Sequence, residues 1–198
     1  IFLLICLQGF IGWYMVSSGL VNRVDVSHYR LALHLVLAFF ILSLIFWNYL
    51  KYKNIKTPQE KTNNFLIMLF IVFLYTQLTI GAFVSGMDAG QIYNSWPFMG
   101  ASYFPDDSQI SSLFTLSAFK EPSLVQFIHR NLAYIILIFY LYILYKFYSL
   151  KLLDYFKILK VIGLLLIIQI LLGVLTLLSG AQIFFSSMHQ ISSIFLIT

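Results

Sequence analysis

Long apolar stretches, each close to 20 residues, dominate the chain and leave few folds open to it. Six can be marked: about 1–20, 31–50, 65–86, 124–146, 158–179 and 183 onwards. A helix of about 20 apolar residues crosses a bilayer core about 30 Å thick, whereas open strand edges are not tolerated in lipid. The chain of 198 residues is 61% hydrophobic and only 10% charged, too few charges for the hydrated surface of a soluble domain. We therefore expect an all-α, polytopic membrane helical bundle with six spans.

The connections between the apolar stretches alternate in charge. The lysines gather in the second and fourth connections, whereas the third, about residues 87–122, is mainly acidic. These lysines are Lys51, Lys53, Lys56 and Lys61, then Lys146, Lys151, Lys157 and Lys160. By the positive-inside rule, the lysine-rich connections face the cytoplasm and the acidic loop faces outward. The net charge of +5 forms no basic stripe, so no nucleic-acid partner is expected.

A spacing of glutamine and glycine recurs in the three stretches that lead outward. The copies are Gln8 and Gly12, Gln77 and Gly81, and Gln169 and Gly173. Either residue alone is common where helices pack, since glutamine forms hydrogen bonds between helices and glycine allows their backbones to approach closely. The repeated spacing, however, indicates a duplication. A stretch with a histidine near its outer end follows each copy, so the repeating unit is a pair of helices. Two such pairs form a four-helix bundle, so three pairs leave a second bundle incomplete. We therefore expect a further pair before Ile1, with a histidine partner for His34.

Three histidines, His34, His129 and His189, are expected at matched depth, one or two turns inside the outer ends of their helices. One histidine in a span could simply bridge two helices, but three at equivalent positions favour a functional site. Zinc would need four ligands, and Cys6 is the only cysteine. A proton relay would need acidic residues within the spans, and the sequence has none there. Haem iron takes axial histidines from facing helices, so His129 and His189 are predicted to hold one haem.

Other residues near these histidines suggest supporting roles. Arg130 directly follows His129, and Arg30 lies one helical turn before His34, so each is a candidate contact for a haem propionate. The alternative for both is an interfacial arginine that extends toward water. His28 falls in a polar connection and is expected to be a solvated loop histidine. The small residues expected to make room for a flat macrocycle are Gly81, Ser85, Gly163 and Gly173.

The third connection contains a polar segment of the kind that closes over a site. It reads GMDAGQIYNSWP from Gly86 to Pro97. Residues Ser112–Lys120 are expected to form a short surface helix. Pro122 is well placed to open the fourth span, because proline is favoured in the first turn of a helix.

Five segments, in order, resemble a known family. They are LQGFIGWYMVSSGLVNRVDVSHYRLALHL, GAFVSGMDAGQIYNSWPFMG, EPSLVQFIHRNLAY, LLIIQILLGVLTLLSG and MHQ. Together they resemble haem A synthases, and more narrowly the branch of alphaproteobacteria and mitochondria. That family has a pseudo-symmetric pair of four-helix bundles, so the resemblance implies that this chain holds the last six of eight helices. Residues 1–50 would be the second pair of the N-terminal half, and 65–198 the C-terminal half, with the outer loop at about 87–122.

The resemblance implies an enzyme, an oxidoreductase that oxidises the C8 methyl group of haem O to the formyl group of haem A for cytochrome c oxidase. His129 and His189 match the histidines that hold haem b in the C-terminal half. His34 matches a ligand of the substrate haem, and Arg130 matches the arginine of the family's His-Arg pair. The family's catalytic glutamate lies in an N-terminal part that this chain lacks, so the fragment alone is expected to be inactive.

The resemblance also implies partners and a location. The expected partners are the substrate haem O, a haem O synthase (protohaem farnesyltransferase), an electron donor such as ferredoxin, the lipid bilayer and a second copy in a homo-oligomer. The expected location is the bacterial inner (cytoplasmic) membrane, with the histidines toward the outer face. From the residues alone, a bis-histidine b-type electron-transfer cytochrome without substrate chemistry and a haem transporter stay open as alternatives.

Overall fold

The computed structural model describes residues 1–19, 25–54 and 64–198, and α-helices make up most of this part of the chain. The long elements are α1 (Phe2–Gly19), α2 (His28–Tyr52), α3 (Asn64–Gly86), α4 (Pro122–Ser149), α5 (Phe156–Leu178) and α6 (Ile183–Ile197). Short 3-10 helices are η1 (Ala89–Gln91), η2 (Ile110–Phe114), η3 (Leu116–Lys120) and η4 (Leu153–Tyr155). The described residues contain no β-strand. The all-α fold class is therefore confirmed.

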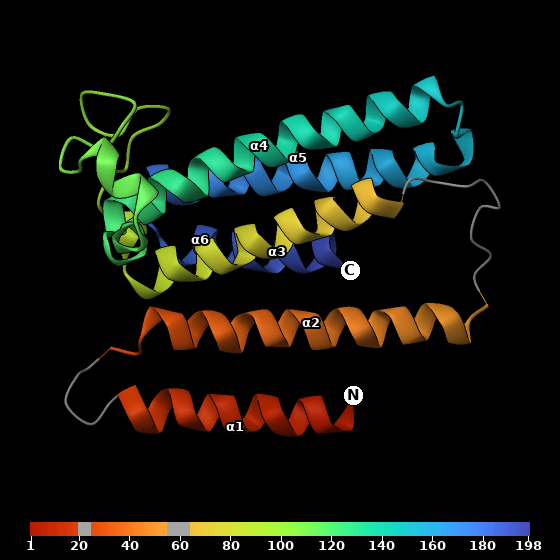
Figure 1. The fold of residues 1–198 in the computed structure, drawn as a ribbon, viewed down its shortest axis with the longest axis horizontal. Helices are drawn as coiled ribbons and strands as arrows, with labels where there is room; N and C mark the ends of the chain where they lie inside the picture. The colour runs from red at the N-terminus through yellow and green to blue at the C-terminus, as the bar shows by residue number, and fades with distance from the viewer. Residues whose placement is uncertain (20–24, 55–63) are drawn as a thin grey trace.

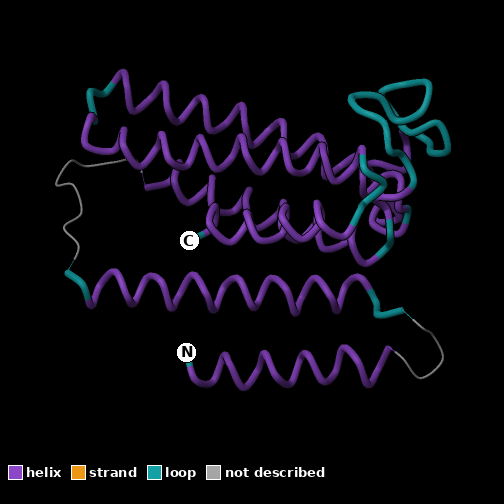
Figure 2. Tube along the Cα trace, turned by 180° about the vertical axis from the view of Figure 1, so that it is seen from behind, coloured by secondary structure: helices purple, strands orange, loops and turns teal. Residues whose placement is uncertain are grey.

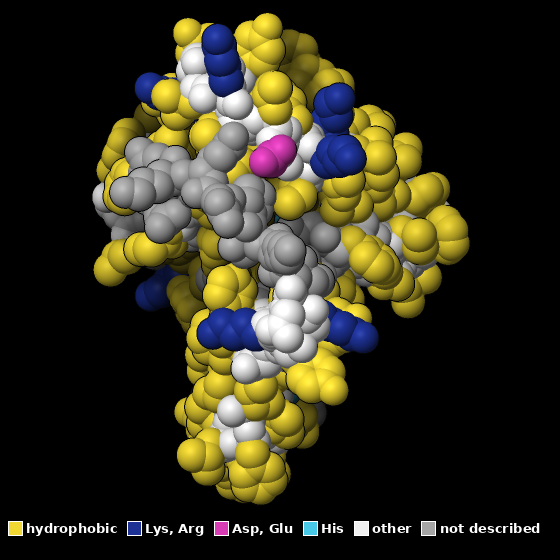
Figure 3. Space-filling view, turned by 90° about the vertical axis from the view of Figure 1, so that its right-hand side faces the viewer, with side chains coloured by type: hydrophobic (Ala, Val, Ile, Leu, Met, Phe, Trp, Pro, Cys, Tyr) yellow, Lys and Arg dark blue, Asp and Glu magenta, His cyan; other side chains and the backbone are white. Residues whose placement is uncertain are grey.

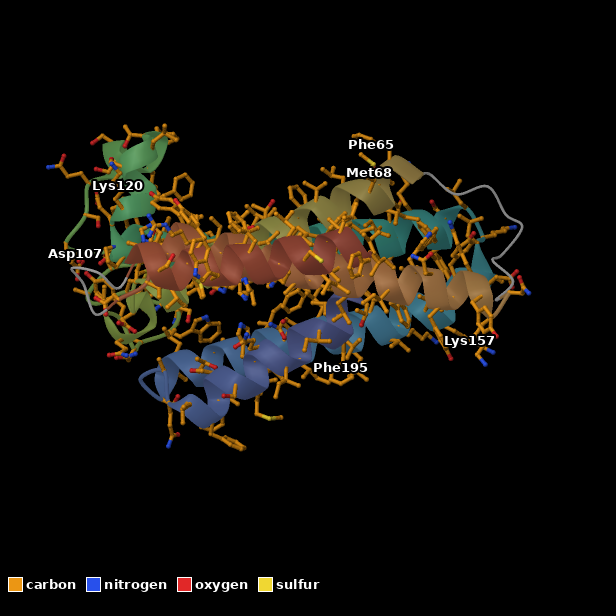
Figure 4. All side chains as sticks on the ribbon, turned by 90° about the horizontal axis from the view of Figure 1, so that it is seen from below. Phe65, Met68, Asp107, Lys120, Lys157 and Phe195 are labelled. Atoms are coloured by element: carbon orange, nitrogen blue, oxygen red, sulfur yellow. The ribbon has the colours of Figure 1, made fainter. Side chains whose placement is uncertain are left out.

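The helices have the length and surface of membrane spans. Four of them, α2, α3, α4 and α5, are long and apolar enough to cross a bilayer, while α1 and α6 are apolar but shorter. Only 17% of the residues in the most apolar window of each long helix are buried inside the protein, so most of their side chains need apolar surroundings. Figure 4 shows Phe65, Met68 and Phe195 at the outside of the bundle, and all three are exposed. The chain is thus a multi-pass membrane bundle.

The helices run side by side along one axis, in alternating directions (Figure 1). In chain order, α1 contacts α2, α2 contacts α3, and α3 packs on α4, while α5 packs closely on α6. Seen from behind, α1 and α2 extend as an arm beside the group formed by α3 to α6 (Figure 2). This alternation brings the first turns of α2, α4 and α6 to the same end of the molecule.

The two ends of the bundle differ in charge, as the sequence predicts. Figure 4 shows Asp107 and Lys120 at the end with the outer loop, and Lys157 at the opposite end. Figure 3 looks onto that opposite end, where lysines gather around the ends of α2, α4 and α5. Three charged residues of the second connection, Lys56, Glu60 and Lys61, lie outside the described residues.

The largest apolar core lies in the half of the bundle farthest from the outer loop. It joins α3, α4 and α5 through Phe70, Leu74, Ile136, Tyr140, Ile143, Phe147, Leu152, Leu159 and Leu166. A smaller cluster near the outer end joins α2, α3 and α4 through Ala32, Ile80, Ala82, Phe83 and Val125. The larger core fixes the α3–α4–α5 group without using the outer turns of α4, which leaves those turns free to carry polar residues.

Two local predictions in the outer loop have different outcomes. Pro122 opens α4, as expected from its fixed backbone angle. The predicted single helix over Ser112–Lys120 is wrong, because two 3-10 helices, η2 and η3, occupy the region. Thr115 between them has an extended backbone, with φ −120° and ψ 157°, and this conformation interrupts the helical path.

Gly163 has a different neighbour from the one expected of it. It does not line space for a macrocycle, because a Cβ added there would overlap the hydroxyl of Tyr140. That hydroxyl donates a hydrogen bond to the Leu159 carbonyl at 2.8 Å. Tyr140 is only 6% exposed, so the bond lies inside the core that joins α4 to α5. Gly163 therefore allows α4 and α5 to pack closely at Tyr140.

A Gly163→Ala substitution is expected to destabilise the bundle by about 1–3 kcal/mol, because the added methyl group overpacks the α4–α5 contact. Thermal unfolding in detergent micelles would measure the effect. In a Tyr140→Phe background the cost should be smaller, since the overlapping hydroxyl is gone. Gly9→Ala is the matched control, because a Cβ there meets nothing within 4 Å. An equal loss of stability in Gly163→Ala and Gly9→Ala would show that the contact with Tyr140 does not cause the destabilisation.

Candidate functional site

The three histidines singled out by the sequence occupy equivalent positions. His34, His129 and His189 lie six, seven and six residues after the first residues of α2, α4 and α6. At a rise of 1.5 Å per residue, each is about 10 Å inside its helix. All three helices start at the end that bears the outer loop (Figure 1). The three histidines thus stand at equivalent positions along their helices, while their depth in a membrane stays a prediction.

Each histidine is held by the helix that precedes it, and His34 shows the pattern. The Gln8 amide nitrogen donates to the His34 carbonyl at 3.0 Å and lies 3.3 Å from His34 Nε2. Gly12 lies one turn further along α1, and a Cβ there would be 3.0 Å from His34 Cε1. Glutamine and glycine thus share the face of α1 that meets the imidazole.

The second pair of helices, α3 and α4, repeats this geometry almost to the tenth of an ångström. The Gln77 amide nitrogen donates to the His129 carbonyl at 3.1 Å and lies 3.4 Å from His129 Nε2. A Cβ at Gly81 would again be 3.0 Å from the Cε1 atom of the ring.

The third pair, α5 and α6, keeps the contacts of the glutamine and the glycine with the imidazole, but its other bonds differ. The Gln169 amide nitrogen lies 3.4 Å from His189 Nε2, and a Cβ at Gly173 would be 3.0 Å from His189 Cε1. The Nδ1 atom of this ring lies 3.1 Å from the Gln169 carbonyl and donates to it. Ser192 binds the Gln169 side-chain oxygen, which fixes the direction of the amide.

The glycines of this unit make room for the imidazole rings. Any side chain at these positions would press on the ring edge, because 3.0 Å is closer than ordinary carbon contact. We expected Gly81 and Gly173 to make room for a macrocycle, but the atoms that they admit belong to the histidines. Ser85, expected to help them, is exposed. The glycines thus determine where the rings stand.

The donor set formed by His129 and His189 fits a haem iron. The two imidazoles come from successive helical pairs, α3 with α4 and α5 with α6. Nδ1 of His129 is buried and has no hydrogen-bond partner among the described residues. Two imidazoles from facing helices are the usual axial ligands of a low-spin haem. These two histidines could therefore hold one haem in the group formed by α3 to α6.

Arg130 attaches the outer loop to α4. Its Nη2 atom donates to the Tyr93 carbonyl at 2.8 Å, and Nη1 donates to the carbonyls of Ser95 and Phe98 at 2.9 and 3.4 Å. The Gln126 amide, one turn earlier on α4, also donates to the Tyr93 carbonyl, at 3.1 Å. The Nε atom of Arg130 is buried without a partner among the described residues. One arginine next to a candidate iron ligand thus fixes the loop above it.

Further side-chain bonds hold the same loop to the helix ends. They join Trp96 to Tyr134 at 2.8 Å, Tyr103 to Asn131 at 2.7 Å, and Asn94 to the Leu177 carbonyl at 2.9 Å. Asp107 accepts a bond from the buried Ser123 hydroxyl at 2.6 Å. That bond is the main reason why the pKa of Asp107 is below its usual value, whereas burial raises the pKa of Tyr93 and of Tyr103. The loop is an ordered cover over the outer ends of α4 and α5.

The prediction that His28 is a solvated loop histidine is wrong. His28 is the first residue of α2, half-buried, and its ring meets the Phe83 ring edge-on at 5.3 Å. Helix α2 starts three residues earlier than the apolar pattern suggested, which draws His28 into the contact. Gly86 permits the approach, since a Cβ there would be 2.9 Å from the His28 Cα atom.

Arg30 contacts the neighbouring helix and, like Arg130, has a buried donor to spare. Its guanidinium carbon lies 5.0 Å from the centre of the Tyr14 ring, a cation–π contact between α1 and α2. Its Nη1 atom is buried and has no hydrogen-bond partner among the described residues. Because Arg30 precedes His34 by one turn on the same face of α2, a buried cationic donor adjoins this histidine.

The sequence interpretation missed the direct role of the glutamines. It assigned Gln8, Gln77 and Gln169 to helix packing, whereas each contacts the histidine of its own pair. The repeated four-residue spacing to glycine was the available signal. The interpretation also missed Gln126, which is 2% exposed and has no repeat partner to mark it.

The family model described as cytochrome oxidase assembly protein (COX15-CtaA) matches residues 1–198, which is the whole chain. The chain belongs to this family. No solved structure shows a significant match.

Among curated proteins similar to this COX15-CtaA chain, one from Pelagibacter ubique (strain HTCC1062) is named Heme A synthase. It is 47% identical over 198 residues, which are 100% of this chain and 58% of the relative. Proteins of the same name from Rickettsia bellii (strain RML369-C) and Rickettsia felis are 38% and 36% identical over 203 and 201 residues. Those matches cover 100% and 99% of this chain and 60% and 59% of the relatives. The chain thus spans less than two thirds of the relatives that it matches.

Proposed function

We propose that the full-length protein is a haem A synthase, an oxidoreductase that oxidises the C8 methyl group of haem O to the formyl group of haem A. The observation that carries this proposal is the 47% identity, over the whole chain, to a relative of that name. Because the chain covers 58% of that relative, the activity is proposed for the complete protein. The chain alone is expected to be inactive.

His129 and His189 are the proposed axial ligands of a haem b in the C-terminal half, residues 65–198. Their equivalent positions in successive helical pairs, each beside a glutamine and a glycine, support this assignment. When bound, such a haem supplies a redox-active iron. The protein orients the two rings through the glutamine and glycine of each pair, and the outer loop excludes water from the outer ends of α4 and α5. Three of the five N–H donors of Arg130 bind loop carbonyls, so its Nε donor and one Nη2 donor remain for a propionate.

His34 is the proposed ligand of the substrate haem in the N-terminal half, of which residues 1–50 are one helical pair. The repeat of the histidine geometry in α1 and α2 supports this role. The unpartnered Nη1 donor of Arg30, one turn from His34, suits a propionate of that haem. Residues from the remainder of the full-length protein would complete the site.

The chemistry requires two successive hydroxylations of one methyl carbon. The resulting geminal diol loses water to give the aldehyde. Each hydroxylation is proposed to consume one molecule of dioxygen as the oxidant, with two protons and with two electrons from a donor such as ferredoxin, and to release one water. Haem O is proposed to come from a haem O synthase. The proposed setting is a bacterial inner membrane, with the lysine-rich end cytoplasmic and the histidines toward the outer face. A homo-oligomer is proposed as the assembly.

A bis-histidine electron-transfer cytochrome is the second candidate, because the His129 and His189 pair alone would suit it. The decisive experiment expresses the full-length protein beside a haem O synthase and analyses the extracted haems. Haem A should accumulate with the wild type and disappear with His34→Ala, while His28→Ala serves as the matched control. Bound haem b together with unaltered haem O would instead identify a cytochrome.

A further inference from the structure

The three glutamines that contact the histidines are arranged to control the protonation pattern of the rings. In the first two pairs, one amide nitrogen reaches both the carbonyl and the Nε2 atom of the same histidine, at 3.0 and 3.3 Å for His34 and at 3.1 and 3.4 Å for His129. A carbonyl only accepts, so the atom that faces it must be the NH₂ group of the amide. In the third pair, the Ser192 hydroxyl occupies the Gln169 oxygen and leaves its NH₂ group facing His189.

An NH₂ group can only donate, which decides the tautomer of a neutral imidazole beside it. The Nε2 atom that receives the donor must carry a lone pair, and the ring proton must then be on Nδ1. His189 gives independent support, because its Nδ1 atom donates to the Gln169 carbonyl at 3.1 Å. For His189, both contacts lead to the same tautomer, whereas at His34 and His129 the contact of the amide with Nε2 alone indicates it.

We propose that Gln8, Gln77 and Gln169 are positioning residues that hold His34, His129 and His189 in the tautomer with the lone pair on Nε2. This inference rests on the proposed haem-binding function. If these histidines held a haem through Nε2, the amide would have to give up its contact with the same lone pair. The contact being displaced is long, 3.3–3.4 Å, and therefore weak. The bond from the amide to the histidine carbonyl at His34 and His129 can persist and keep the ring in place.

The first test uses the full-length protein, freed of haem and titrated with haem b. Gln77→Leu keeps a similar volume and removes the donor, so the affinity for haem b should fall roughly 10–100-fold, as for other groups that orient metal ligands. The low-spin absorption and EPR signals should become mixed with high-spin signals. Gln190→Leu, on an exposed position next to His189, is the matched control and should change neither. Gln169→Leu repeats the test from α5 if the α3 variant does not fold.

The second test needs no haem. Nitrogen NMR of the ¹⁵N-histidine-labelled, haem-free protein should show a protonated Nδ1 and a bare Nε2 on His129, and a mixture of tautomers in Gln77→Leu. A protonated Nε2 in the wild type would overturn the proposal. So would full haem affinity in Gln77→Leu, provided that His129→Ala abolishes the low-spin signal. If His129→Ala keeps that signal, the haem assignment itself fails.

Discussion

Replacing His189 with alanine is expected to abolish the low-spin, bis-histidine signal of the C-terminal haem in the full-length protein. The ring sits beside Gly173, with Nε2 facing Gln169 and Nδ1 bonded to the Gln169 carbonyl. Alanine leaves the iron without one of its two axial nitrogens, so the signal should turn high-spin or vanish. Absorption and EPR spectra of the reduced and oxidised protein would measure the change. His129→Ala should have the same effect, since the two rings are proposed to ligate one iron.

The His189 experiment has a chemical rescue and a matched control. A His189→Gly variant leaves a space the size of the ring, and added imidazole should restore the low-spin signal. His28→Ala removes the same side chain at the outer end of α2, away from the C-terminal pair, and should leave the signal intact. An unchanged bis-histidine spectrum in His189→Ala would reject this ligand assignment.

Arg130→Ala is expected to release the outer loop from α4. Its guanidinium donates to the carbonyls of Tyr93 and Ser95 at 2.8 and 2.9 Å, and alanine leaves both acceptors without this partner. A hydrogen bond to a charged group contributes about 1.5–3 kcal/mol, and about 1.4 kcal/mol corresponds to a factor of ten in an equilibrium. Amide hydrogen exchange over residues 91–100 should therefore accelerate about tenfold or more.

Two related variants sharpen this test. Arg130→Lys keeps the charge but lacks the planar fork that reaches two carbonyls at once, so exchange should be intermediate. Arg30→Ala removes another arginine near the outer end, one that contacts Tyr14 on α1, and should leave exchange over these residues unchanged. Equal exchange rates in wild type and Arg130→Ala would show that the remaining bonds hold the loop without it.

The helices could be predicted from sequence because lipid imposes a simple rule on their length. The predicted starts at 31 and 124 differ from the observed His28 and Pro122 by three and two residues. Apolar periodicity cannot detect a helical turn made of polar residues, which is why His28 was placed in a loop. The four predicted histidine and arginine positions on α2 and α4 all lie within helices near the outer end.

Contacts between helices were harder to predict, because they depend on how the helices are rotated about their axes. The spacing of Gln77 and Gly81 revealed a shared face but not that His129 stands on it. Gly163 has the same small side chain yet faces Tyr140. The acceptors of Arg130 are backbone carbonyls, which every residue has, so no residue type in the loop could identify them.

Each histidine takes its glutamine and glycine from the helix immediately before it in the chain. The contact partners are 26, 52 and 20 residues apart, so none of the three units requires a distant part of the protein. During synthesis, a helical hairpin can therefore acquire its finished ring orientation as soon as its second helix has entered the bilayer. When the hairpins later assemble, the imidazole rings already have their final orientation. The orientation of each ring therefore does not depend on the slower association of helices that are distant in sequence.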